Sequence, residues 1–387
     1  MVQTGLDRMV ADRFARFRGE RVAFVCNQAS VDADFRHLID LAQEAGVEIA
    51  CAFGPQHGIW GHTQDNMVEW EGYEDPRTGL RFYSLYGEHR SPTEESLKGV
   101  DRLVFDVPDV GARYYTFIWT LANCMSACTQ NQVQVTVLDR PNPINGTDVE
   151  GPVMQPAFAS FVGLYPLPAR HGMTVGEVGN YLQRDHIQGC DYSVVELTGW
   201  QRDMFFQGIG LPWVAPSPNM PTADTALVYP GMCLLEGTNL SEGRGTTRPF
   251  ETFGAPWLDG RELSKRLNDL ALPGVSFRPT TFEPTFQKHA GKVCEGCFIH
   301  VRDRKAFHPV LTAIAVITAS REMGNGKFEW RQPPYEYEYE RLPFDILAGN
   351  EWLRHAIEEA TSLGTIQERI SQETAAFEAV RKASLIY

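Results

Sequence analysis

Residues suited to acid–base and anion-binding chemistry are concentrated in one stretch, residues 234–251, which reads LLEGTNLSEGRGTTRPFE. Arg244 and Arg248 each carry parallel N–H donors that match a carboxylate or a phosphate. Three glycines permit positive φ angles, which let backbone N–H groups converge on an anion: Gly237, Gly243 and Gly245. Three glutamates add ionisable oxygens: Glu236, Glu242 and Glu251. We interpret the stretch as a site for an acidic small molecule; the alternative is a surface loop whose arginines and glutamates simply pair.

The elements that must position this stretch begin with four predicted strands in the first third of the chain. They are short apolar runs at residues 21–27, 48–53, 101–107 and 133–139. Helical patterns at residues 35–45 and 115–130 lie between them, and a further short strand is predicted at residues 80–85. Strands that alternate with helices predict an α/β fold with a parallel sheet covered on both faces. No GxGxxG follows the first strand, so a dinucleotide cofactor is not expected.

Polar residues follow all four of these strands, at the edge where open parallel sheets bind ligands. The residues at this edge are Asn27, Gln28, Gln56, His57, Asp109, Arg113, Arg140 and Asn142. Any one of them also suits an ordinary helix cap, but four strands ending in this way favour a binding edge. His57 fits a general acid, a hydroxyl-binding group or a structural histidine.

Three other positions are further candidates for substrate binding. Tyr114 belongs to a group of tyrosines that either line a sugar-sized cleft or pack in the core. His171 precedes a helix that begins with a capping box, Thr174 with Glu177, so it is either ligand-facing or part of the cap. Asn219 lies in a loop with three prolines, and such rigid loops commonly present binding groups.

The composition excludes several classes of protein. A net charge of −14 argues against nucleic acid as a partner, because a duplex-binding surface needs an excess of lysine and arginine. The apolar runs are too short to cross a bilayer, so no membrane partner is expected. The first residues, MVQTGLDRMVADRF, lack the apolar core of a signal peptide. We expect a cytoplasmic protein, or a periplasmic or secreted one if a leader has been removed.

The eight cysteines predict neither a disulfide framework nor a metal site. Most of them lie inside apolar runs, where a free thiol behaves as a small hydrophobe. Cys294 and Cys297 form a CxxC, but His289 and His300 do not complete a zinc pattern. No metal is therefore expected.

The second part of the chain reads as a mixed α+β region. Helices are predicted at residues 260–268, 308–322, 352–357 and 365–382, and a strand at residues 297–302. The alternating run YEYEYE, residues 335–340, predicts an edge strand. A proline-rich crossing segment at residues 152–168 favours a domain boundary, with residues 1–156 forming the first domain and 157–387 the second.

Long motifs spread over nearly the whole chain resemble the NamZ-type exo-β-N-acetylmuramidases, glycoside hydrolase family 171, long listed as a domain of unknown function. The motifs are GPQHG, SLYG, VFDVPDVGARYYT, VLDRPNP, FVGLYPLP, RHGMT, PSPNMPT, LLEGTN, SEGRGTTRPFE and PFDILAG. The resemblance implies a Rossmann-like N-terminal domain, a smaller α+β C-terminal domain and a site in the cleft between them. It also implies release of N-acetylmuramic acid from the non-reducing end of peptidoglycan fragments in bacterial cell-wall recycling, without metal or nucleotide.

The chemistry of muramic acid agrees with the arginine-rich stretch. Muramic acid carries a lactyl carboxylate that N-acetylglucosamine lacks, so a muramidase needs a cation to recognise it. Arg244 or Arg248 suits this role, with Arg113 or Arg140 as alternatives.

One position departs from the family pattern. Where the family usually has Pro-Glu-His-Gly, with that glutamate the favoured catalytic residue, this chain has Gln56. An amide neither donates nor accepts a proton as an acid or base at neutral pH. Either another carboxylate takes over the role, the candidates being in order Glu242, Glu236, Asp109, Asp65 and Glu69, or the protein acts on a different glycoside of a related acidic amino sugar. Assistance by the 2-acetamido group of the substrate would require only one protein acid.

Two other functions fit the same residues. Loss of hydrolysis at Gln56 would leave a protein that binds muropeptides or sugar acids, and a nest of glycines and arginines would also suit a phosphosugar-processing enzyme. The sequence leaves the oligomeric state open.

Overall fold

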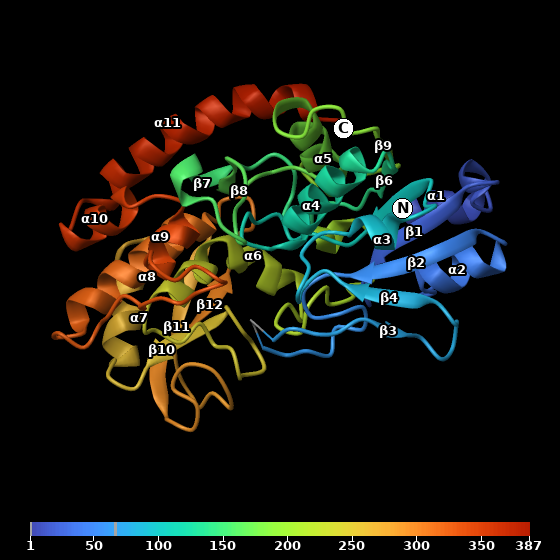
Figure 1. Cartoon of the computed structure of the whole chain (residues 1–387). Helices are drawn as coiled ribbons and strands as arrows, with labels where there is room; N and C mark the ends of the chain where they lie inside the picture. Colours follow the sequence, from blue (N-terminus) through green and yellow to red (C-terminus); the bar gives the residue numbers. More distant parts are fainter. Residues whose placement is uncertain (1, 66–67) are drawn as a thin grey trace.

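The structure is a computed structural model that describes residues 2–65 and 68–387 (Figure 1). A seven-stranded sheet with the order β3-β4-β2-β1-β5-β6-β9 dominates its first part. Neighbouring strands are parallel except for β3 and β4 at one edge. The predicted strands are confirmed as β1, β2, β4, β5 and β6. The bounds are β1 (Arg21–Cys26), β2 (Glu48–Gly54), β3 (Tyr73–Glu74), β4 (Arg81–Ser84), β5 (Arg102–Asp106), β6 (Gln134–Leu138) and β9 (Tyr192–Val195).

Both faces of this sheet are covered, as predicted. Val22 and Phe24 of β1 pack in one hydrophobic core, and the intervening Ala23 and Val25 pack in another, which follows from the two-residue period of a strand. Side chains of α1 and α2 belong to the first core and those of α4 and α5 to the second. The helix bounds are α1 (Gly5–Ala11), α2 (Leu38–Glu44), α3 (Glu94–Leu97), α4 (Phe117–Gln130) and α5 (Val175–Asp185). All eight cysteines are free and buried, which confirms their predicted role as small hydrophobes.

The second part of the chain is a smaller α+β unit. Its antiparallel sheet has the order β10-β12-β11; helix α7 packs against this sheet, and α8 packs against α7. The long helix α11 runs along the top of the view in Figure 1 and contacts both β7 and α5 of the first part. The bounds of the remaining elements of both parts are β7 (Glu150–Val153), β8 (Pro168–Arg170), β10 (Thr252–Ala255), β11 (Val275–Phe282), β12 (Cys294–Val301), α6 (Ala223–Met232), α7 (Gly260–Asp269), α8 (Pro309–Met323), α9 (Pro343–Ala348), α10 (Trp352–Glu358) and α11 (Leu363–Arg381).

The sheet extends beyond the predicted domain boundary. The boundary after residue 156 lies before β9, which pairs with β6 in the seven-stranded sheet. Every strand of that sheet precedes α6. We therefore propose that the first domain ends at the start of α6.

The prediction of an edge strand at residues 335–340 is wrong. The segment forms a tight turn in which the backbone groups of Tyr335 and Glu338 exchange two hydrogen bonds of 2.9 Å. Glu336 and Tyr337 have φ angles of 44° and 68°, which lie in the left-handed region and cannot continue a strand. The side chains of Tyr335 and Glu336 are both buried, so the alternation of tyrosine and glutamate does not mark one polar and one apolar face.

A buried arginine, Arg113, joins the two parts of the molecule. Its guanidinium donates to the backbone carbonyls of Pro152 at 2.9 Å, Leu167 at 2.6 Å and Leu347 at 2.5 Å. Leu347 belongs to α9 of the second part. Burial lowers the pKa of Arg113 to about 10, so the guanidinium remains charged at neutral pH.

Replacing Arg113 with methionine should lower the free energy of unfolding by about 2–4 kcal/mol, because three backbone carbonyl groups each lose a charge-assisted hydrogen bond. The same change at the half-exposed Arg248 should alter it by less than about 0.5 kcal/mol. Urea denaturation followed by circular dichroism measures both variants. Equal stability of the two variants would contradict the joining role of Arg113.

Candidate active site

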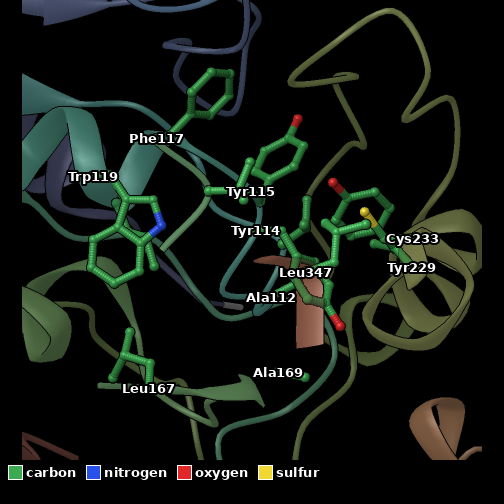
Figure 2. Close-up of a cluster of buried hydrophobic side chains, with 14 of the residues drawn as sticks. Ala112, Tyr114, Tyr115, Phe117, Trp119, Leu167, Ala169, Tyr229, Cys233 and Leu347 are labelled. Carbon is green, nitrogen blue, oxygen red and sulfur yellow. The ribbon is translucent and has the colours of Figure 1, made fainter. Parts of the chain in front are cut away.

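A pocket lies where the carboxyl edge of the large sheet meets the second part of the chain. Aromatic side chains form much of its wall, and Figure 2 shows Tyr114, Tyr115, Phe117 and Tyr229 side by side in the adjoining core. Their rings meet edge to face, with centroids 4.8–6.1 Å apart. The predicted site residues that line this pocket are Gln56, His57, Tyr114, Asn219, Glu236 and Arg244.

The end of β2 brings Gln56 and His57 to the pocket. His57 has a φ of 72°, a left-handed conformation that turns the chain away from the sheet, and its Nδ1 lies 2.7 Å from the carbonyl oxygen of Thr63. Burial lowers the pKa of the imidazole to about 4, with a smaller contribution from Arg244. His57 is therefore neutral at physiological pH and is suited to hydrogen bonding of a hydroxyl group.

Glu236 and Arg244 form a buried ion pair in the pocket. Arg244 donates from Nε and Nη2 to Oε1 of Glu236 at 3.2 and 2.7 Å, and the hydroxyl of Tyr335 donates to Oε2 at 2.7 Å. Burial raises the pKa of Glu236, but Arg244 and Tyr335 outweigh it and the pKa is lowered overall. Glu236 is therefore ionised. Gly243 and Gly245 adopt φ angles of 80° and 79°, which provide the turns that place Arg244 here.

The pocket contains a second carboxyl group, that of Glu336, whose pKa is raised rather than lowered. Its side chain is 4% exposed, and its Oε2 accepts a hydrogen bond of 3.0 Å from the hydroxyl of Tyr86. Burial, with the nearby charge of Glu236, raises its pKa to about 7, although Tyr86 lowers it. The pocket thus holds one carboxyl group that is ionised and one that is substantially protonated at neutral pH. Such divergence is typical of acid–base pairs in enzymes.

Four other predicted residues lie at or behind the carboxyl edge without lining this pocket. Arg140 forms a bidentate pair with the buried Asp106, at 2.5 and 2.8 Å. His171 Nε2 lies 3.1 Å from Asp109, which also accepts from the backbone of Gly111. Asn142 bonds the backbone of Met173 and Ile144. Asp109 and Arg140 instead line a separate, proline-rich hollow.

The remaining predicted residues are engaged elsewhere. Arg113 binds the three carbonyl groups described above, and Arg248 is half-exposed and pairs with Glu251 at 3.6 Å. Glu242 is buried, 2.7 Å from Lys288 and 3.5 Å from Arg244, behind the pocket lining. Asp65 accepts from Gln287, and Glu69 accepts from the hydroxyl of Tyr337 at 3.0 Å.

Sequence reasoning missed Glu336 and Tyr335 as site residues. Both belong to the alternating run that predicted a strand, and strand alternation gives no reason for two consecutive side chains to face one pocket. An acidic residue between two tyrosines directly after two prolines is the signal that the sequence offers. Among the described residues, no group of three or more His, Cys, Asp or Glu side chains is placed to hold a metal ion.

Comparison with known proteins yields two family models that cover most of the chain. The N-terminal and C-terminal models of exo-beta-N-acetylmuramidase NamZ match residues 22–224 and 227–387. The chain is 43% identical, over 387 residues, to the peptidoglycan beta-N-acetylmuramidase NamZ of Bacillus subtilis (strain 168), covering 100% of this chain and 91% of that protein. Two crystal structures of DUF1343 family proteins from Bacteroides fragilis match 100% of this chain and 99% of theirs. Their TM-scores are 0.90 and 0.77, at 30% and 27% identity.

Replacing Tyr86 with phenylalanine should raise the pKa of Glu336 above about 7, because the hydroxyl of Tyr86 favours the carboxylate. Carboxyl ¹³C NMR of glutamate-labelled protein measures the titration, and the signal that disappears in Glu336→Gln identifies the residue. Tyr83→Phe, a half-buried tyrosine on β4, is the matched control and should leave the midpoint unchanged. A lowered or unchanged pKa in Tyr86→Phe would contradict this account of the pocket.

Proposed function

Because this chain belongs to the NamZ family of exo-beta-N-acetylmuramidases, we propose that it is a glycoside hydrolase that releases N-acetylmuramic acid from the non-reducing end of peptidoglycan fragments. The observation that carries this proposal is the pair of buried carboxyl groups, one ionised and one with a raised pKa, in a single pocket. Glycoside hydrolysis uses a proton donor for the leaving oxygen and a negative charge near the carbon where positive charge develops. Glu236 supplies the negative charge.

The walls of the pocket suit an amino sugar. Tyrosine and phenylalanine rings pack against the apolar faces of a sugar, and Asn219, His57 and Ser217 offer polar groups for its hydroxyls and acetamide. Asn219 is itself held by Gln64, whose backbone carbonyl accepts from it at 3.0 Å. These contacts support a carbohydrate rather than a nucleotide.

Of the four arginines considered for the lactyl carboxylate, Arg244 is the one in the pocket lining. Its Nε and Nη2 bind Glu236, while its Nη1 makes no hydrogen bond within the described parts of the chain. The two N–H donors of Nη1 therefore remain for an anionic group of the substrate. We assign recognition of the lactyl carboxylate to Arg244.

The proposal places the protein in cell-wall recycling. None of the helices in residues 2–65 and 68–387 combines the length and apolar character that a bilayer crossing needs. The expected cytoplasmic location, and the expected absence of a nucleic-acid partner, remain part of the proposal.

The Gln56 substitution favours one second candidate function, that of a family member that binds muramyl sugars without cleaving them.

The purified protein should release N-acetylmuramic acid from a MurNAc-GlcNAc disaccharide and 4-nitrophenol from 4-nitrophenyl β-N-acetylmuramide. Glu236→Gln should lower kcat/KM at least about 100-fold, because the negative charge opposite the reacting carbon is lost. Mass spectrometry of the products shows from which end the sugar leaves. Tight calorimetric binding of N-acetylmuramic acid without any release would establish the binding protein instead. Competition by inorganic phosphate for the pocket would favour a phosphosugar enzyme.

Replacing Arg244 with lysine should lower kcat/KM for 4-nitrophenyl β-N-acetylmuramide about 10–100-fold more than for the corresponding glucosaminide, since a bidentate charged contact is lost. Arg248→Lys, in the same stretch but outside the pocket, is the control and should leave both values within about twofold. An equal loss on the two substrates would remove the carboxylate assignment, because a general disturbance of Glu236 affects both.

A further inference from the structure

Gln56 occupies the pocket position where the family resemblance leads one to expect a glutamate. Its side-chain oxygen accepts a hydrogen bond of 2.8 Å from Thr116, and its Nε2 donates to the hydroxyl of Tyr86 at 3.1 Å. The amide is thus fixed on both sides. It has no proton to transfer at neutral pH, so this position offers binding but no acid catalysis.

Tyr86 connects Gln56 to a carboxyl group. The Tyr86 hydroxyl donates to Oε2 of Glu336 at 3.0 Å, and Tyr86 is fully buried. Thr116, Gln56, Tyr86 and Glu336 therefore form one continuous row of hydrogen bonds. Gln56 and Glu336 both line the pocket, and the Tyr86 hydroxyl lies between them in this row.

The backbone around Glu336 is strained in a way that favours a functional role. Three pocket residues other than glycine have left-handed φ angles: His57 at 72°, Phe250 at 62° and Glu336 at 44°. Such conformations are unfavourable for residues other than glycine and persist where surrounding contacts enforce them, commonly at active sites. At Glu336 the enforcing contacts are the Tyr335–Glu338 backbone bonds and the Arg90 guanidinium, 3.4 Å above the ring of Tyr337.

We propose that Glu336 has taken over the proton-donor role that Gln56 cannot perform, which makes it the general acid of this chain. This inference rests on the proposed glycoside hydrolysis and names a residue for it. Glu236 is excluded as the donor, because Arg244 and Tyr335 keep it ionised. Glu242 pairs with Lys288, away from the pocket lining.

Cleavage of the glycosidic bond by this route requires Glu336, Glu236, the substrate and one water molecule. The carboxyl proton of Glu336 moves to the glycosidic oxygen while the bond from that oxygen to the anomeric carbon breaks, and its electron pair stays on the departing oxygen. The positive charge that develops at the anomeric carbon is stabilised by ionised Glu236. Water then forms the new bond to the anomeric carbon and returns one proton to Glu336, which restores the acid.

The charged and titratable groups around Glu336 set the pH range in which it carries its proton. Burial and the charge of Glu236 raise its pKa, while Tyr86, Arg244 and Arg90 lower it, and the result is about 7. Tyr335, bonded to Glu236, stays protonated because burial raises its pKa. A donor acts only when protonated, so activity should fall as the pH rises through about 7.

Glu336→Gln, compared on two substrates with different leaving groups, tests the proposal. MurNAc-GlcNAc needs protonation of its leaving oxygen, whereas 4-nitrophenolate departs readily without it. We expect kcat/KM for the disaccharide to fall about 10³-fold and that for the aryl substrate less than about 10-fold. The fall in kcat/KM as the pH rises through about 7, which we expect with the disaccharide, should also be absent with the aryl substrate. Equal losses on both substrates, or retention of this pH dependence, would overturn the proposal.

Two further variants complete the design. Glu338→Gln lies in the same turn but outside the pocket lining, and it should leave both activities within about threefold. The double variant Glu336→Gln/Gln56→Glu should regain at least tenfold in disaccharide cleavage over Glu336→Gln, because a carboxyl group returns to the other end of Tyr86. Absence of this recovery would contradict the idea that the two positions serve one proton transfer.

The same experiments separate failure of this inference from failure of the proposed function. If the wild-type protein cleaves neither substrate, hydrolysis itself is refuted, and the inference with it. If the wild-type protein cleaves both and Glu336→Gln slows them equally, hydrolysis stands and only the assignment of Glu336 fails.

Discussion

The chemistry of the pocket depends on how two carboxyl groups share one desolvated space. Burial alone would raise the pKa of both. Arg244 and Tyr335 bind Glu236 and keep it ionised, while Glu336 accepts a hydrogen bond from the Tyr86 hydroxyl and its pKa is raised by the charge of Glu236. The buried Arg244–Glu236 pair therefore gives the two groups different charges. The same burial keeps His57 neutral.

Much of the fold follows from local sequence. The apolar runs that became β1, β2, β5 and β6 are bounded by polar residues, and burial on both faces explains why they lack alternation. The stretch around Arg244 could also be recognised, because it combines glycines at turns with arginines and glutamates. Two of its predicted site residues, Glu236 and Arg244, line the pocket.

The orientation of side chains at the sheet edge could not be predicted in the same way. Gln56, Asp109 and Arg140 all follow strands, yet Gln56 faces the pocket, while Asp109 and Arg140 line another hollow. Arg113 turns inward to carbonyl groups that lie 39 to 234 residues away in the chain, and no local pattern records such partners. Glu336 escaped prediction because its turn depends on left-handed backbone angles that its alternating sequence conceals.

The bond between Tyr86 and Glu336 joins residues 250 positions apart, one from each half of the molecule. If the two halves were separated at this point, the bond would break and water would reach the carboxyl group of Glu336. A glutamate carboxyl group in water titrates near its ordinary pKa, so Glu336 would then be ionised at neutral pH. The proton on Glu336 therefore depends on the contact between the two halves, which makes the interface part of the chemistry of the pocket.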